Sequence, residues 1–168
     1  LKEMLGEAGQ SHIFLNPPEP AGARTGLLGA DFRAEGGFWR FAKIYRGDEA
    51  NEKSRGPLAA PGVVVNEGDF LLAVDDKPLR ASAEVFSAFE GLAGKQVKLT
   101  VSGAPSTAAS REILVRLVAD ERVVRYVEWA RANRTRVTEA TGGRVGYIHL
   151  PNVGEGGVEA FRKEWMAQ

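Results

Sequence analysis

Two adjacent residues near the start of the chain, Ser11 and His12, have side chains that act together in serine-dependent hydrolysis. A serine hydroxyl is a poor nucleophile until a base within hydrogen-bonding distance takes its proton, and that base needs a third group to fix its orientation. The groups that share this task can lie far apart in a sequence. Taken alone, the pair is more typical of an ordinary surface histidine beside a linker, so a catalytic and a structural interpretation both stay open.

Other chemistries find little support in the residues. The second histidine, His149, is far from His12 in the sequence, and no HExxH or similar spacing occurs, so we expect no metal site and no cofactor. The glycine-rich run 154–157 lacks the Lys-Ser/Thr of a phosphate-binding loop. Asp75 and Asp76 are explained more simply by turn chemistry than by a catalytic carboxylate pair.

The composition is that of a globular protein. With 168 residues, of which 43% are apolar, the chain can bury a core. The 22 basic and 22 acidic residues balance and no basic run with interleaved aromatic residues occurs, so we expect no nucleic-acid partner. No apolar run approaches the roughly 18 residues that cross a membrane, so we expect no membrane partner. The absence of cysteine excludes disulfides and leaves the compartment open.

The elements of the chain are organised around residues 66–79, where a buried strand is predicted. The apolar run Phe70 to Val74 is bounded by a Gly-Asp turn on one side and by an acidic, proline-containing turn on the other. Such a run is too short for a buried helix.

A β-hairpin is predicted before that strand. Runs 26–35 and 38–46 are rich in residues that favour strands, and Gly36-Gly37 between them supplies the positive φ that a tight hairpin turn needs. Phe41 and Ile44 are three residues apart, which breaks the alternation of a regular strand, so we expect a bulge or a strong twist.

Residues 57–62 are expected to hold one helical turn that ends at Pro61. An amphipathic helix is predicted from Glu84 to Leu92, with a serine cap at Ser82 and apolar side chains on one face. Two further strands, which we expect to pair antiparallel, are predicted at 96–101 and 113–118.

From residue 120 onward the pattern changes to that of an α/β protein. A helix from Glu121 to about Ala140 is closed by Gly142-Gly143, a buried strand is expected at Val145–Pro151, and a second helix begins after the glycine-rich run. We therefore divide the chain into residues 1–20, 21–118 and 119–168. Because the chain begins with Leu and the last segment resembles a helix cut midway, we expect a piece of a longer protein.

The middle part, residues 21–118, resembles a PDZ domain of the kind found in bacterial and archaeal proteases. Gly68-Asp69 with the strand after it, the loop Leu28-Gly29-Ala30 and the helix from Glu84 follow one another in the order typical of that family. The resemblance implies an α+β fold: a partly open β-barrel or sandwich of five to six strands, capped by one long and one short helix and flanked by helical and α/β fragments.

The resemblance also implies a peptide-binding groove between a strand edge and a helix. An extended peptide can pair with an exposed strand edge while alternate side chains enter a pocket, and backbone N–H groups of the loop can hold a terminal carboxylate. The helix side chains are equally consistent with an ordinary core. The candidate peptide-binding residues are Leu27, Leu28, Gly29, Ala30, Asp31, Phe32, Val85, Phe86 and Phe89.

The flanking segments resemble the tricorn protease family. Ser11-His12 precedes the proline-rich linker and the PDZ-like part, and Gly146-Tyr147-Ile148-His149-Leu150-Pro151 follows it. The resemblance implies that His12 is the general base of a serine peptidase, that Ser11 helps to orient it, and that the nucleophilic serine lies beyond Gln168. It also implies a cytoplasmic protein.

Two functions of different class are therefore kept. The first is a part of a tricorn-like serine peptidase whose PDZ-like module binds or guides extended or C-terminal peptides, or scaffolds the core. The second is a stand-alone peptide-binding or scaffolding domain without a catalytic role. The expected partners are peptides or protein C-termini and the remaining domains of the parent protease, and we also consider a homo-oligomer. We expect residues 1–20 and 120–168 to expose apolar surface.

Overall fold

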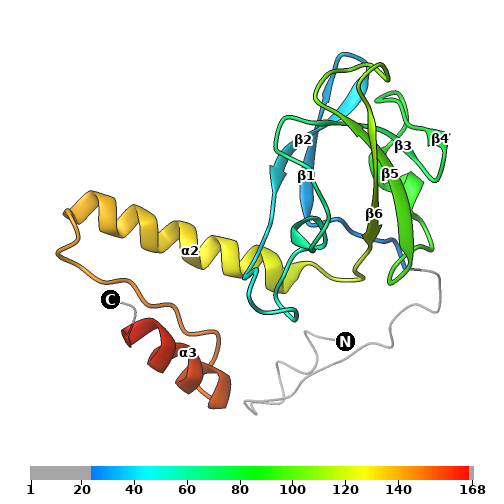
Figure 1. Ribbon diagram of the computed structural model, residues 1–168. Coiled ribbons are helices and arrows are strands. Elements are labelled where there is room, and N and C mark those ends of the chain that lie inside the picture. Colours follow the sequence, from blue (N-terminus) through cyan, green and yellow to red (C-terminus); the bar gives the residue numbers. More distant parts are fainter. Residues whose placement is uncertain (1–23, 167–168) are drawn as a thin grey trace, which may run out of the picture.

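The computed structural model describes residues 24–166. Figure 1 shows a curved antiparallel sheet at one end of the molecule and two helices, α2 and α3, at the other. The sheet has six strands, with the order β1-β2-β3-β5-β6 and the short β4 beside β3. The predicted α+β fold of five to six strands is confirmed.

The predicted hairpin is formed by β1 (Ala30–Glu35) and β2 (Phe38–Ile44). Gly36 and Gly37 have φ angles of 59° and 78° at the turn, the region that glycine enters at little cost. The pairing passes from Asp31–Lys43 to Phe32–Phe41, so Ala42 is the extra residue of a β-bulge. Because of this bulge, Phe41 and Ile44 are both buried although they are three residues apart.

The predicted buried strand is β3 (Phe70–Val74), which lies between β2 and β5 (Gln96–Ser102). Leu71 and Val74 belong to the main core, while Phe70 and Leu72 pack with Phe38 in a second buried cluster. Both faces of the strand are therefore covered, which explains why its sequence is apolar without alternation.

The sheet curls into the partly open barrel that was expected. β4 (Lys77–Pro78) follows β3 through a turn, and β6 (Arg111–Arg116) pairs antiparallel with β5 along its length. Leu27, just before β1, forms a bridge with Val118, just after β6. This bridge joins the two ends of the strand order, while β1 and β6 themselves do not pair.

The two short helices beside the sheet differ in how well they were predicted. The turn at 57–62 is confirmed as the 3-10 helix η1 (Pro57–Ala59). The long amphipathic helix expected at Glu84–Leu92 is wrong, because that segment holds only the 3-10 helix η2 (Val85–Phe89).

Local hydrogen bonds explain the short η2. Glu84, rather than Ser82, is the cap: its carboxylate and its carbonyl oxygen both accept from the backbone N–H of Ser87, three residues later, and the Ser87 hydroxyl donates to the same carbonyl. These bonds favour the tighter 3-10 turn. Gly91, at φ 69°, then ends the helical path.

The helix predicted after residue 120 is confirmed as α2 (Arg122–Thr141), which ends at Gly142 in the left-handed conformation. The second helix is present as α3 (Glu155–Met166), but it begins within the glycine-rich run 154–157 rather than after it, since Gly156 and Gly157 lie in its first turn. Figure 1 shows α2 extending away from the sheet, with α3 along its flank.

The buried strand expected at Val145–Pro151 is wrong, since this segment has no strand in the structure. A strand needs a neighbouring edge to satisfy its backbone groups, and within residues 24–166 this segment pairs with no strand. His149 packs instead on α2, 4.7 Å from the ring centre of Trp129 and 5.5 Å from that of Tyr126.

The described C-terminal part exposes apolar side chains, as expected for residues 120–168. They are Val123, Trp129, Val145, Leu150, Val153, Val158, Phe161, Trp165 and Met166. Within residues 24–166, neither α2 nor α3 has the length and apolar character needed to cross a membrane.

Candidate functional site

The conformation of the loop that leads into β1 is fixed by two buried residues and the glycine between them. Leu28 and Ala30 point into the core and are buried, while Gly29 between them has a φ of 68°. The Gly29 carbonyl accepts a hydrogen bond from the N–H of Tyr45, 2.8 Å away. A side chain at this position would be crowded, because its Cβ would lie 3.3 Å from Cδ of Pro57 and 3.4 Å from the Tyr45 carbonyl oxygen. The loop therefore depends on glycine both for its conformation and for its packing.

The strand after this loop has a free edge. β1 pairs with β2 only, and among residues 24–166 no other strand pairs with it. η2 lies close to this region, because the Gly26 N–H donates to the Phe89 carbonyl at 2.8 Å and the ring of Phe86 meets that of Phe32 edge-on at 6.2 Å. A strand edge beside apolar side chains has the two features that an added peptide strand requires.

The predicted peptide-binding residues lie together around the loop, β1 and η2, but their side chains are in three different environments. Leu28, Ala30, Val85 and Phe89 are buried and belong to the core. Leu27 is engaged by its bridge with Val118. Those with accessible surface beside the free edge are Asp31, Phe32 and Phe86.

Glu121, which was not among the predicted site residues, binds the Gly29 N–H of the loop through its side chain. Glu121, immediately before α2, directs its side chain at the loop, and its Oε2 accepts a hydrogen bond from the Gly29 N–H at 2.9 Å. The carboxylate is mostly buried, with 13% of the side chain exposed. The loop amide that was expected to hold the carboxylate of a peptide thus holds a carboxylate of the same chain.

Arg125 connects Glu121 to β1. Its Nε donates to Oε1 of Glu121 at 2.6 Å, and its Nη2 donates to Oδ1 of Asp31 at 2.8 Å. The guanidinium also lies over the ring of Tyr45, 4.1 Å from its centre, and the Tyr45 hydroxyl donates to Oδ2 of Asp31 at 2.7 Å. We call Gly29, Asp31, Tyr45, Glu121 and Arg125 the Arg125 network.

The electrostatics of the Arg125 network favour its charged groups. Burial opposes ionisation of Asp31, but the hydrogen bonds from Tyr45 and Arg125 and the charge of Arg125 outweigh it, so the pKa of Asp31 is lowered. Burial and the neighbouring Asp31 carboxylate raise the pKa of the Tyr45 hydroxyl. Burial disfavours the Arg125 cation, yet the hydrogen bonds to Asp31 and Glu121 prevail, and its pKa is raised.

One part of the Arg125 network was visible in the sequence. Glu121 and Arg125 are four residues apart on a predicted helix, the spacing at which opposite charges pair. Nothing in the sequence pattern links Glu121 to Gly29, because the two are 92 residues apart and meet only through the curvature of the sheet.

A second contact fixes α2 to the sheet further along the helix. Oε1 of Glu128 accepts from the Gly47 N–H at 3.0 Å, and Nη2 of Arg131 donates to the Gly47 carbonyl at 3.0 Å. α2 therefore rests on both the loop before β1 and the loop after β2.

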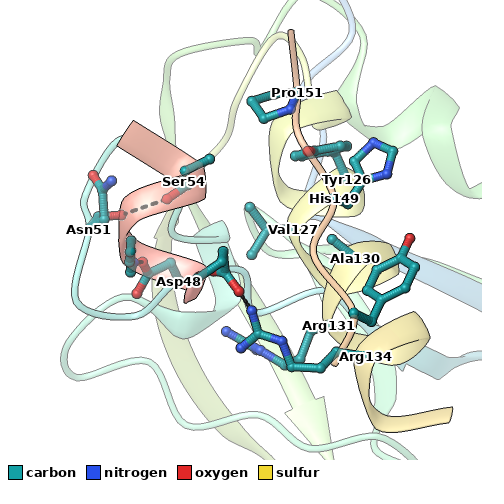
Figure 2. Close-up of a pocket in the computed structure, with 14 residues that line it drawn as sticks. Asp48, Asn51, Ser54, Tyr126, Val127, Ala130, Arg131, Arg134, His149 and Pro151 are labelled. Carbon is teal, nitrogen blue, oxygen red and sulfur yellow. Dashed lines mark hydrogen bonds and ion pairs between the residues drawn. The ribbon is translucent and has the colours of Figure 1, made fainter. Parts of the chain in front are cut away.

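A cavity of about 410 Å³ lies between α2, the loop after β2, the segment before α3 and α3 itself. Figure 2 shows Tyr126, Val127 and Ala130 of α2 facing this space, with His149 and Pro151 at its border. Charged groups at the cavity are used in pairs, Lys163 with Asp48 at 3.1 Å and Arg134 with Glu164. These pairs hold α3 against α2 and against the loop after β2. We therefore interpret the cavity as a packing gap between these elements rather than as a binding site.

Among residues 24–166, no three His, Cys, Asp or Glu side chains gather where they could hold a metal ion. The predicted catalytic residues, Ser11 and His12, lie outside the described residues.

Comparison with known proteins identifies the fold and the family. Residues 26–120 match the family described as the tricorn protease PDZ domain. A tricorn protease homologue of Streptomyces coelicolor is 40% identical over 91% of this chain, and one of Saccharolobus solfataricus is 33% identical over 100% of it. The chain spans 14% and 16% of the length of these two relatives. A crystal structure of the tricorn protease superimposes on 86% of the chain with a TM-score of 0.76 and 28% identity, and the match covers 14% of that protein. This chain, with its PDZ-type sheet between β1 and β6, therefore belongs to the tricorn protease family.

Proposed function

We propose that this chain is the PDZ-containing part of a tricorn-type serine peptidase, and that its free strand edge binds or guides extended peptide segments. The observation that carries the proposal is the unpaired edge of β1, within the described residues, beside the apolar contact between Phe32 and Phe86. Backbone groups on such an edge pair with any sequence, and an adjacent apolar surface adds a preference for some side chains. The tricorn protease PDZ family match over residues 26–120 supports the same function.

The affinity expected of this site is modest. Each backbone hydrogen bond along the edge contributes roughly 0.5 to 1.5 kcal/mol, and one buried apolar side chain contributes about 1.5 to 3 kcal/mol. Offset by the cost of ordering the peptide, these terms support binding that is at best micromolar, about 8 kcal/mol. Such binding suits a substrate guide.

Amide chemical shifts test this binding. A series of apolar-ended peptides, titrated against the isotopically labelled chain to millimolar concentration, is expected to shift the amides of residues 27–33 and of η2 (Val85–Phe89). The amides of α3 (Glu155–Met166) serve as an internal control, since they belong to another part of the fold. If no amide of residues 27–33 moves at millimolar peptide, the site does not bind peptides.

The catalytic part of the proposal concerns His12 and Ser11. In it, His12 is the general base and Ser11 helps to orient it, while the nucleophile comes from a later part of the parent protein. The His12→Ala variant of the full-length protein is expected to lose peptide hydrolysis while its circular dichroism spectrum is unchanged. Retained activity would remove the assignment.

The proposal also covers the domain organisation, the compartment and the oligomeric state. Residues 1–20 and 119–168 belong to the two halves of a catalytic core, and residues 21–118 are the PDZ domain. The exposed apolar side chains of α2, α3 and the segment between them fit a surface that the remaining domains of the peptidase cover. We also propose a cytoplasmic protein and a homo-oligomer of the full-length chain, which cell fractionation and size-exclusion chromatography of the full-length protein can test.

A further inference from the structure

We infer that Glu121 excludes peptide C-terminal carboxylates from the loop Leu28-Gly29-Ala30, so that the groove prefers internal, extended segments. This inference rests on the proposed peptide-binding function and names the class of peptide that the same site selects. Its basis is the hydrogen bond from the Gly29 N–H to the Glu121 carboxylate, 2.9 Å long.

The Glu121 side chain is directed at the loop rather than at its own helix. Glu121 is the cap residue of α2, yet its side chain makes no capping hydrogen bond to the helix. A cap side chain ordinarily accepts from the N–H groups of the first turn. Here both carboxylate oxygens are used elsewhere, Oε2 on the Gly29 N–H and Oε1 on Arg125.

The position of Glu121 is fixed by its neighbours. Val124, in the first turn of α2, is buried, and its Cγ1 would lie 3.9 Å from a Cβ at Gly29, so α2 packs directly on the loop. Arg125 bonds Glu121 at 2.6 Å and Asp31 of β1 at 2.8 Å. The Glu121 carboxylate is therefore held between the loop and a cation that is itself anchored to the sheet.

A terminal carboxylate of a peptide in this loop competes with Glu121 for the Gly29 N–H. One backbone N–H supplies one strong hydrogen bond, so the peptide must displace Glu121 or forgo that bond. Displacement leaves the largely buried Glu121 without the Gly29 donor, and Asp31 and Glu121 already share the one guanidinium of Arg125. The Lys43 ammonium, 4.7 Å from the centre of the Tyr45 ring, is a further cation near Asp31. An internal segment along β1 carries no terminal carboxylate and makes no such demand.

The inference is tested with two matched peptides and the whole 168-residue chain. One fluorescein-labelled peptide ends in Ala-Leu-Val with a free carboxylate, and the other has the same end as an amide and one added upstream Asp, which equalises the net charge. With the unaltered chain, the amide is expected to bind at least as tightly as the acid. With Glu121→Ala, the acid is expected to bind roughly tenfold more tightly and the amide to be unchanged, since one charged hydrogen bond is worth about that factor.

Two further variants sharpen the test. Glu121→Gln keeps an oxygen that can accept from Gly29 but removes the charge, so an intermediate gain for the acid is expected. Glu128→Ala removes a carboxylate of the same helix that binds Gly47 instead, and it is expected to leave the ratio of the two affinities unchanged.

The outcomes separate this inference from the proposed function. If the peptides bind but Glu121→Ala leaves the acid-to-amide ratio unchanged, or strengthens both peptides equally, the inference is wrong and peptide binding stands. If no peptide binds any variant, the proposed function fails and the inference fails with it. The Gly29 amide resonance gives an independent readout without peptide, because loss of its acceptor in Glu121→Ala must shift it, and an unshifted resonance would contradict the contact.

Discussion

The Glu121 carboxylate accepts a hydrogen bond from the Gly29 N–H across 92 residues of sequence. This contact joins the helix that follows the sheet to the loop that opens it. It makes the loop part of the connection between the PDZ domain and α2, in addition to any role in binding. Two of the four predictions below concern this connection, the third concerns the proposed peptide site beside it, and the fourth concerns the Gly-Asp turn before β3.

The first prediction concerns Arg125, which bonds Asp31 and Glu121 at once. Arg125→Ala leaves two carboxylates without their shared donor, and we expect it to lower the free energy of unfolding by about 1–2 kcal/mol. Urea unfolding, followed by tryptophan fluorescence, measures the change. Arg125→Lys keeps the charge but cannot bond both partners with one planar fork, so it is expected to restore only part of the loss.

The matched control for this prediction is Arg122→Ala. Arg122 lies on the same turn of α2, but 89% of its side chain is exposed and its ion-pair partner is the neighbouring Asp120. Its removal is expected to change the free energy of unfolding only slightly, by less than about 0.5 kcal/mol. Equal effects of the two variants would show that the Arg125 network contributes no specific stability.

The second prediction follows from the lowered pKa of Asp31. Because the folded-state pKa lies below the unfolded value of about 3.9, the ionised group stabilises the fold above that value. The contribution is lost as the pH falls through the folded-state pKa. With 45% of the side chain exposed, solvent screening limits it to on the order of 0.5 kcal/mol.

Comparison of Asp31→Asn with the unaltered chain checks this dependence. The difference in the free energy of unfolding is expected to be present at neutral pH and to shrink as the pH falls below about 4. Glu52→Gln, at an exposed position of the loop after β2, serves as the control and is expected to show no difference at either pH. A difference for Asp31→Asn that grows toward low pH would contradict the sign.

The third prediction distinguishes the proposed peptide site from the core within η2. Phe89 is 1% exposed and belongs to the main core, so Phe89→Ala is expected to cost about 3–5 kcal/mol of unfolding free energy. Phe86 is only partly buried against Phe32. Phe86→Ala is therefore expected to cost much less stability while it weakens peptide binding, measured by fluorescence anisotropy. Unaltered binding in Phe86→Ala would remove this side chain from the groove.

The fourth prediction concerns the Gly-Asp turn before β3. Asp69, with 11% of its side chain exposed, accepts from the Asn66 N–H at 2.9 Å and forms an ion pair with Arg111 of β6. Asp69→Ala removes both interactions and is expected to cost about 2–3 kcal/mol of unfolding free energy. Asp69→Asn keeps an acceptor for Asn66 and is expected to cost less.

Asp76→Asn provides the comparison, because Asp76 pairs with Lys98 at the surface with 74% of its side chain exposed. Asparagine also tolerates the positive φ of 63° at this position. Its effect is expected to stay below about 0.5 kcal/mol. If thermal unfolding ranks Asp76→Asn as the more damaging change, the importance assigned to Asp69 is wrong.

Short-range patterns were enough to predict most of the elements. The Gly-Gly turn indicated the hairpin, the spacing of Phe41 and Ile44 indicated its bulge, and the uninterrupted apolar run indicated β3. The glycines after residue 141 marked the end of α2. In each case, the property that decides the structure, a positive φ or the side-chain period, belongs to a few neighbouring residues.

Two predicted elements were wrong, for different reasons. In one, local hydrogen bonds override the helical period of the side chains; in the other, the required partner is distant in the sequence. The period of Val85 and Phe89 fits an α-helix, but the Glu84–Ser87 hydrogen bonds select a 3-10 turn. The apolar run 145–151 has the composition of a strand, but strand formation depends on an adjacent edge that the pattern does not encode.

The candidate site divides in the same way. By itself, the sequence determined the loop Leu28-Gly29-Ala30 and the strand that follows it, because glycine and apolar residues specify local conformation. Only the tertiary structure decided that, among the described residues, the edge of β1 stays unpaired and that the Glu121 carboxylate accepts the hydrogen bond of the Gly29 N–H. Closure of the sheet through Leu27 and Val118 places the start of α2 against Gly29, and a contact of that kind depends on the path of the whole chain rather than on the residues that it joins.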